Sequence, residues 1–365
     1  MKKKKHSREL ITTLTRAFFI LTFALLSLGG LYGKSGFTAY APQRNGTPVI
    51  STVLDARTHN ESSDLNPHGF PQTSARALCL ISGDSGELLY CQNGNEALPM
   101  ASTTKIMTAL VALERCSADS VVTVPREACN IEGSSVYLRE GEKITVRDLL
   151  YGLMLESGND AACALAIASY GSVDKFVTAM NKRARELGLV STSFANPHGL
   201  PAENHYTTAR ELAKIAYTAM QNPLFREIVK TKTYTAKGEN GEPTRYFSNH
   251  NRLLGSYEGT VGIKTGYTLS AGRCLVTSAL RDGTSFIAVT LGDRNDFADH
   301  RTMYDFAFEN FRTVHFAKKG EVCGIFGGVK MGSFGEIAFT VHKDDEKSSF
   351  DTEITLRMCS DFNNN

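Results

Sequence analysis

Apolar and polar positions alternate in regular patterns through the middle of the chain and predict an ordered region that begins near Ser74. Two apolar-rich runs flank a turn signal at residues 82–86, an arrangement typical of a β-hairpin. In the segments that follow, apolar residues recur every three or four positions, the spacing of a helix with one buried face. We therefore expect a hairpin from Ala75–Ile81 and Glu87–Cys91, then helices at Ser102–Glu114, Val146–Leu155, Asp160–Tyr170, Val173–Leu187 and Thr208–Met220.

The pattern changes near residue 260, where short β-rich runs replace the helical repeats. These runs cover Thr260–Thr265, Arg273–Arg281 and Ser285–Leu291, and a last helical pattern follows at Ala298–Phe311. Strands at both ends of a helical segment indicate an α+β fold in which helices pack on an antiparallel sheet. Roughly 240 residues are enough for one large core, so residues 74–312 are expected to form one domain.

The segments on either side of this domain differ from it in composition and in the pattern of apolar residues. Residues 1–41 begin with lysines, continue with an apolar run and end on Ala39-Tyr40-Ala41, a pattern that predicts an export signal. The apolar run approaches the length of a membrane span, so a retained anchor is the alternative. Residues 42–73 are polar and aperiodic and predict a flexible tether. Residues 313–365 predict a small β-rich C-terminal domain with strands at Glu336–Val341 and Thr352–Met358.

Charge excludes one class of function. The 365 residues carry 40 Lys and Arg against 38 Asp and Glu, and residues 1–41 hold seven of the basic groups but one acid. The remaining chain therefore has 33 basic and 37 acidic groups. A mildly acidic surface lacks the basic stripe that phosphate backbones require. We expect no nucleic-acid partner.

The eight cysteines do not predict a metal site. They form no Cys-x-x-Cys pair, and such spacing is the usual mark of structural zinc. We therefore expect no metal and no cofactor. Cys79 and Cys91 flank the predicted hairpin. The expected register offsets them by about one residue, which argues against a disulfide without excluding it.

A serine and a lysine at helical spacing are the first candidates for chemistry. Ser102 and Lys105 stand three positions apart at the predicted start of a helix, so both side chains lie on one face. A serine hydroxyl becomes a nucleophile when a neighbouring base takes its proton. A lysine amine can be that base if its pKa falls towards neutrality. The alternative is that Ser102 caps the helix and Lys105 is solvated.

The same spacing occurs a second time, at Ser172 and Lys175. That match precedes an ordinary surface helix, and Asp174 is available to neutralise the lysine. We therefore expect Ser172 to be a helix cap rather than a nucleophile.

Two further polar triplets follow the first motif. Ser157-Gly158-Asn159 falls in the turn between two predicted helices, and Lys264-Thr265-Gly266 falls at the end of a predicted strand. The first offers a hydroxyl and an amide, and the second offers a cation, a hydroxyl and a glycine that permits close backbone approach. Each triplet alone is equally consistent with a helix cap or an exposed edge strand.

In this order the triplets resemble those of the penicilloyl serine transferases, which are the penicillin-binding proteins and the active-site-serine β-lactamases. Within that group the chain is similar to the low-molecular-mass D-alanyl-D-alanine carboxypeptidases. The resemblance covers residues 74–312. It rests on the triplets and on their surroundings, which include Gly86–Tyr90, Pro99–Thr108, Ser157–Ala162, Phe194–Leu200 and Gly262–Thr268.

The resemblance implies a transpeptidase-type fold and a role for each motif residue. Ser102 is implied to form an acyl-enzyme, with Lys105 as its general base and Ser157 as a further catalytic group. The implied substrate-binding residues are Asn159, Lys264, Thr265, Gly266, Tyr267 and Arg301. The backbone N–H groups of Ser102 and Tyr267 are implied to form the oxyanion hole.

The implied activity is removal of the terminal D-alanine from peptidoglycan stem peptides, outside the cytoplasm, with β-lactams as inhibitors. The C-terminal domain is shorter than is usual in the family and shows no apolar face for a membrane, so membrane association would depend on the N-terminal segment. Three alternatives stay open: a β-lactamase, a non-catalytic binding module, and a serine hydrolase assisted by His198, His205 or His250.

Overall fold

The computed structural model of the chain describes residues 69–238 and 241–317. It also describes the strand residues 37–40, 43–44, 47–48, 51–54, 322–326, 329–332 and 337–342. The described elements fall into two compact units. The larger lies within residues 60–319 and 336–348, and it contains every residue implied in chemistry.

A five-stranded antiparallel sheet is the centre of the larger unit. Its strand order is β11-β12-β13-β5-β6. The bounds are β5 (Ala77–Ser82), β6 (Leu88–Gln92), β11 (Thr260–Thr268), β12 (Gly272–Arg281) and β13 (Thr284–Leu291). The predicted hairpin and the three later strands are therefore confirmed. Because β11 is the last strand on its side, its outer edge is open to neighbouring helices rather than to another strand.

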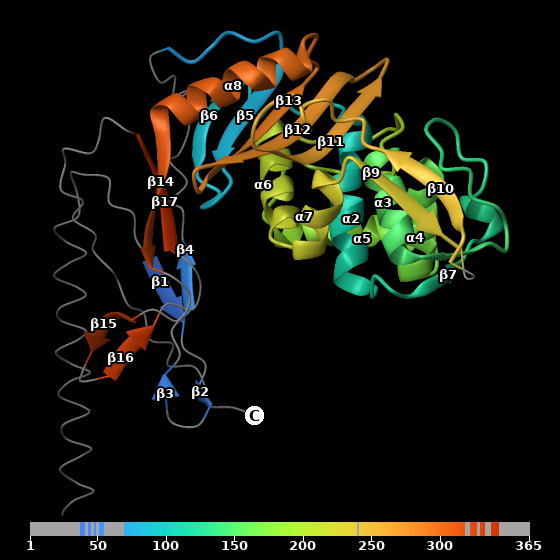
Figure 1. Cartoon of the computed structure of the whole chain (residues 1–365), viewed down its shortest axis with the longest axis horizontal. Helices are drawn as coiled ribbons and strands as arrows, with labels where there is room; N and C mark the ends of the chain where they lie inside the picture. The colour runs from blue at the N-terminus through green and yellow to red at the C-terminus, as the bar shows by residue number, and fades with distance from the viewer. Residues whose placement is uncertain are drawn as a thin grey trace, which may run out of the picture. The chain divides into compact units, whose positions relative to one another are not determined.

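Helices cover both faces of this sheet. Figure 1 shows α6 (Ala209–Met220) against one face and α8 (Asp296–Asn310) against the other. The remaining helices are α2 (Lys105–Arg115), α3 (Val146–Leu155), α4 (Asn159–Tyr170), α5 (Val173–Glu186) and α7 (Pro223–Lys230). All the predicted helices are present, and the expected α+β class is confirmed. The sequence pattern missed α7, which is only eight residues long.

Alternation along β5 shows how the sheet builds two cores. Leu78 and Leu80 pack beneath α8, while Cys79 and Ile81 pack against the helices on the other face. Every residue of β5 is buried, as expected for a strand covered on both sides.

The short elements complete the larger unit. They are the 3₁₀ turns η1 (Ala101–Thr104) and η2 (Arg126–Ala128), and the strands β7 (Val121–Thr123), β8 (Lys143–Thr145), β9 (Thr233–Lys237), β10 (Pro243–Ser248), β14 (Phe311–Ala317) and β17 (Ile337–His342). β14 pairs with β17, so the boundary expected between residues 312 and 313 falls inside a strand. Thr313 and Thr340 join these strands to the sheet through hydrogen bonds to Asp84 and Ser82.

The described residues of the smaller unit form three antiparallel strand pairs. They are β1 (Phe37–Tyr40) with β4 (Ser51–Leu54), β2 (Gln43–Arg44) with β3 (Thr47–Pro48), and β15 (Val322–Phe326) with β16 (Val329–Gly332). β2, β3 and β4 lie within the range 42–73, for which the sequence predicts a flexible tether.

Several sequence predictions concern residues outside the described ones. Most of the predicted export signal, at residues 1–36, and the expected strand at Thr352–Met358 belong to this group. Of the helices that the structure describes, none has the length and apolar character that a membrane span requires.

The register of β5 with β6 corrects one expectation. Cys79 lies directly opposite Cys91, and the Cys91 thiol donates to the Cys79 sulfur at 2.9 Å. The offset of one residue was wrong because the register shifts between Leu80 and Ile81.

Candidate active site

Ser102 and Lys105 meet where η1 passes into α2. The Lys105 Nζ lies 3.0 Å from the Ser102 Oγ, and the lysine side chain is fully buried. The spacing of three residues therefore places both groups on one side of the turn, as expected from helical geometry. The solvated lysine that the sequence left open is excluded.

The surroundings of Lys105 favour its neutral amine. Its Nζ also lies 2.7 Å from the Asn159 Oδ1 and 2.5 Å from the His198 carbonyl oxygen. Burial, followed by the positive charge of Lys264, holds the pKa of Lys105 well below its usual range. A neutral amine has two N–H donors and one lone pair. The two carbonyl oxygens can only accept, so the donors are used there and the lone pair faces the Ser102 hydroxyl.

The turn between α3 and α4 brings Ser157 and Asn159 to the same place. Ser157 is buried with φ at 63°, and its Oγ has no hydrogen-bond partner among the described residues. Buried hydroxyls without a partner are uncommon and costly, and strained backbone is often found at functional sites. This combination supports the prediction that Ser157 is a functional residue.

The orientation of Asn159 is fixed from the other side. Its Nδ2 donates to the Glu132 carbonyl at 2.6 Å, and its backbone N–H donates to the Ser134 carbonyl at 2.7 Å. Because the side-chain nitrogen is used in this way, the Oδ1 is the atom turned to Lys105. The loop at residues 132–138 therefore orients the Asn159 amide, which the Ser157-Gly158-Asn159 motif alone does not orient.

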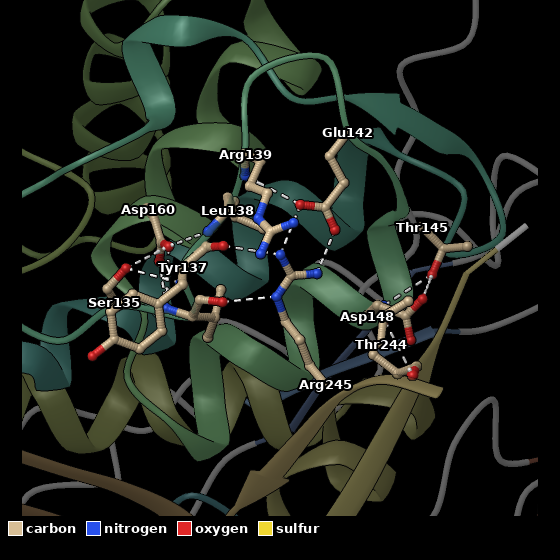
Figure 2. Close-up of polar contacts among 12 residues, drawn as sticks. Ser135, Tyr137, Leu138, Arg139, Glu142, Thr145, Asp148, Asp160, Thr244 and Arg245 are labelled. Atoms are coloured by element: carbon tan, nitrogen blue, oxygen red, sulfur yellow. Dashed lines mark hydrogen bonds and ion pairs between the residues drawn. The ribbon is translucent and has the colours of Figure 1, made fainter. Parts of the chain in front are cut away.

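That loop is in turn held by the residue after Asn159. Figure 2 shows the Asp160 carboxylate accepting hydrogen bonds from Ser135 and Leu138. On the outer side, Arg245 binds Glu142 and also donates to the Tyr137 carbonyl. Charge-assisted bonds of this kind are stronger than neutral ones. The loop and the turn at Ser157 are thus one connected polar network.

The edge strand β11 contributes Lys264, Thr265 and Gly266 to the cluster. Lys264 is 1% exposed, and burial lowers its pKa to about 7. The positive charge of Lys264 lowers the pKa of Lys105. A Cβ added at Gly266 would lie 3.0 Å from the Ser102 backbone nitrogen, which explains why glycine stands at this point of the edge strand. Thr265 is half-buried and Tyr267 is 62% exposed, on either side of that glycine.

Arg301 is not part of this cluster. It lies on α8, and its guanidinium donates to the Ser256 carbonyl at 2.7 Å and to the Ser256 Oγ at 2.6 Å. No described hydrogen bond joins it to Ser102, Lys105 or Lys264. Recognition of a substrate carboxylate by Arg301 therefore stays a prediction, which its present contacts do not support.

The second serine–lysine pair is structural, as expected. Ser172 is the N-cap of α5, and its side chain accepts from the backbone N–H of Lys175. The three histidines considered as bases are also not placed beside Ser102 by any described hydrogen bond. His198 contributes its carbonyl to Lys105, while His250 pairs with Glu156 at 3.3 Å.

A cavity of about 400 Å³ opens next to the nucleophile. Its lining residues are Pro99, Met100, Ala101, Gly199, Pro201, Ala202, His205, Thr268 and Ser270. Thr268 ends β11, so the cavity lies beyond Tyr267 along the strand from Lys264. Burial lowers the pKa of His205 to about 4, so the lining is uncharged at neutral pH.

Comparisons with known proteins agree with this geometry. Residues 64–295 match a family described as D-alanyl-D-alanine carboxypeptidase. The chain is 39% identical over 259 residues to D-alanyl-D-alanine carboxypeptidase DacF of Bacillus subtilis, covering 68% of this chain and 65% of that protein. It is 41% identical over 238 residues to the D-alanyl-D-alanine carboxypeptidase of Streptomyces sp. strain K15, covering 60% and 81%.

The fold has a solved counterpart. The crystal structure of the Streptomyces K15 DD-transpeptidase is similar with a TM-score of 0.62 and 36% sequence identity, covering 66% of this chain and 98% of that one. The chain spans just under two thirds of the length of the Bacillus subtilis relative. The family match nevertheless covers more than half of this chain and includes all three polar triplets. This chain therefore belongs to the D-alanyl-D-alanine carboxypeptidase family.

Proposed function

We propose that the protein is a serine-type D-Ala-D-Ala carboxypeptidase that removes the terminal D-alanine from peptidoglycan stem peptides. The observation that carries the proposal is the buried amine of Lys105, 3.0 Å from the Ser102 Oγ, with a pKa held low by burial and by Lys264. An amine in this state can take the proton of the serine hydroxyl at neutral pH.

In the acylation step, the Ser102 Oγ attacks the carbonyl carbon of the penultimate D-alanine. A C–O bond forms as the peptide C–N bond breaks, and the serine proton passes to Lys105. The leaving nitrogen receives a proton by way of the Ser157 hydroxyl, whose Oγ has no described partner in the free protein. Backbone N–H groups of Ser102 and Tyr267 stabilise the negative charge on the carbonyl oxygen.

The terminal carboxylate of the substrate is bound by Lys264 and Thr265 in this proposal. A protonated Lys264 attracts the carboxylate, and the Thr265 hydroxyl donates a hydrogen bond to it. Asn159 binds the substrate from the opposite side while it orients Lys105. Hydrolysis of the ester by water then releases the shortened peptide and restores Ser102.

A β-lactam would acylate the same serine and leave slowly. Asp160 is the carboxylate whose charge acts on Lys105, yet its oxygens accept hydrogen bonds from Ser135, Val136 and Leu138. A carboxylate occupied in this way cannot activate a water for rapid hydrolysis. We therefore propose β-lactams as inhibitors and not as substrates turned over at speed.

The location follows from the substrate. Peptidoglycan lies outside the cytoplasm, so we propose that residues 1–41 direct export and that a retained apolar segment would keep the enzyme at the membrane. Expression of the full chain, followed by sequencing of the mature N-terminus, tests this step.

Mass spectrometry of the intact protein tests the activity. Penicillin should add its mass at Ser102, and the adduct should persist for minutes or longer, while Ser102→Ala should acquire none. A pentapeptide ending in D-Ala-D-Ala should lose one alanine. Absence of any adduct on the wild-type protein would refute the acyl-enzyme, and rapid release of the penicilloyl group would favour a β-lactamase instead.

A further inference from the structure

A chain of hydrogen bonds runs from His205 to the residue before the nucleophile. The His205 Nε2 lies 2.8 Å from the Thr104 Oγ1, and the Thr104 Oγ1 donates to the Ala101 carbonyl at 2.8 Å. At the other end of the ring, the His205 Nδ1 accepts from the Ala195 backbone N–H at 2.9 Å. His205 and Thr104 are both buried.

The direction of this chain is fixed at both ends. A backbone N–H can only donate, so the Nδ1 is unprotonated and the ring proton is on the Nε2. A carbonyl oxygen can only accept, so the Thr104 hydroxyl hydrogen points to Ala101. The Thr104 oxygen must therefore accept from the His205 Nε2–H. Burial lowers the pKa of His205 to about 4, which is consistent with a neutral ring.

The carbonyl at the end of the chain belongs to a strained residue. Ala101 has φ at 47°, a left-handed conformation that alanine rarely adopts. Gly199 packs so closely against the same carbonyl that an added Cβ would clash with the Ala101 oxygen. Such a conformation persists only where the surroundings fix it. Rotation of the peptide after Ala101 would turn the Ser102 N–H, which is one of the two oxyanion donors proposed above.

We propose that His205, acting through the Thr104 hydroxyl, is a positioning residue that holds the Ala101–Ser102 peptide in the orientation required for acylation. The inference rests on the proposed acylation of Ser102, but it assigns a role to a residue outside the three motifs. His205 touches no reacting atom in this proposal and is not the base.

Two substitutions of His205 distinguish the contribution of its Nε2 from that of its Nδ1. The amide nitrogen of glutamine reaches the position of the histidine Nε2, so His205→Gln keeps a donor for Thr104. The amide of asparagine reaches the position of the Nδ1, so His205→Asn keeps an acceptor for Ala195 and loses the donor. We expect the acylation rate constant with a fluorescent penicillin to fall about ten- to a hundredfold in His205→Asn. It should fall much less in His205→Gln.

A purely structural role for His205 in the loop at Ala195 predicts the reverse order, and that result would overturn the proposal. Thermal unfolding of both variants shows whether each is folded. Thr104→Val provides a second test, because it removes the hydroxyl and keeps the shape. It should slow acylation to a similar extent, and adding His205→Asn to it should cause little further loss.

A measurement independent of activity tests the same assignment. Nuclear magnetic resonance of protein with ¹⁵N-labelled histidine should show His205 as the neutral Nε2–H tautomer at pH 7. Detection of the Nδ1–H tautomer or of an imidazolium would contradict the hydrogen-bond chain. Failure of the wild-type protein to form any acyl-enzyme would instead refute the proposed function, so the two failures are distinguishable.

Discussion

At the scale of single residues, two buried lysines share the polar cluster, and the proposed mechanism requires them in opposite charge states. Lys105 must be neutral to accept a proton, whereas Lys264 must be charged to attract a carboxylate. Burial and the positive charge of Lys264 lower the pKa of Lys105, because like charges repel in a buried site. The pKa of Lys264 falls to about 7 through burial, so its charge is lost just above neutrality.

Lys264→Arg should change the alkaline limb of the pH profile. In the wild-type protein we expect kcat/KM for a D-Ala-D-Ala peptide to fall as pH rises above about 7, because Lys264 loses its proton there. Arginine stays charged at all working pH values, so the decline should move to higher pH or disappear. An unchanged alkaline limb in the variant would show that another group titrates. Circular dichroism checks that the larger side chain is accommodated.

At the scale of elements, the edge strand β11 and the first turn before α2 approach each other unusually closely. Gly266 makes this contact possible, because an added Cβ would lie 3.0 Å from the Ser102 nitrogen and 3.1 Å from the Thr103 nitrogen. The contact joins Gly266 to Ser102, 164 residues apart in the sequence, and it aligns the nucleophile with the strand.

Gly266→Ala should therefore slow acylation by fluorescent penicillin about tenfold or more, since small displacements at a reacting group are costly. Gly83→Ala is a matched control, because its Cβ would crowd the Ser285 Oγ at the β5–β6 turn, away from Ser102. We expect the control to acylate at the wild-type rate. Equal slowing in both variants would indicate a general loss of packing rather than a local effect on Ser102.

The polar network in Figure 2 connects α4 to the loop that orients Asn159. Asp160→Asn would replace an acceptor with a donor that faces the hydroxyl of Ser135 or the N–H of Leu138. Because these bonds are buried and charge-assisted, the free energy of unfolding should fall by about 2 to 3 kcal/mol in urea titrations. Asp174→Asn, an exposed change in α5, should have little effect. Equal stability of the two variants would contradict the role of the network.

At the scale of the whole molecule, α8 is attached to the sheet through a buried histidine. The His300 ring lies between the hydroxyls of Thr277 and Thr290, and burial lowers its pKa to about 3. The unfolded chain binds a proton at this position below about pH 6.5, whereas the folded protein does not until about pH 3. Stability therefore falls as pH drops through this window.

We expect His300 to cost about 2 to 3 kcal/mol of stability between pH 7 and pH 4.5. Asp293 opposes this change, because its pKa is raised to about 6 by burial and its carboxyl group becomes stabilising as it protonates. The comparison with His300→Asn isolates the histidine. The melting temperature of the variant should decline less over this pH range than that of the wild-type protein. Parallel declines would show that His300 does not cause the acid sensitivity.

Much of the local structure follows from sequence alone. Helices and strands of the larger unit are visible as periodic patterns because each pattern records which face of an element is buried. The pairing of Ser102 with Lys105 is also local, since three residues in a helical turn fix it. Short or unpatterned elements such as α7, β2 and β3 were missed, because few residues give too weak a periodic signal.

Tertiary structure decides the properties that allow Ser102, Lys105 and Asn159 to form a site. The carbonyl of His198, the loop at Glu132 and the edge glycine Gly266 act on Lys105, Asn159 and Ser102 from distant parts of the chain. The low pKa of Lys105 depends on its burial and on the proximity of Lys264, which a sequence motif contains but cannot place beside Lys105. Sequence determined which groups are present and which neighbours share a turn. Their charge states and orientations were decided by long-range packing, because desolvation and hydrogen-bond direction exist only once the chain is folded.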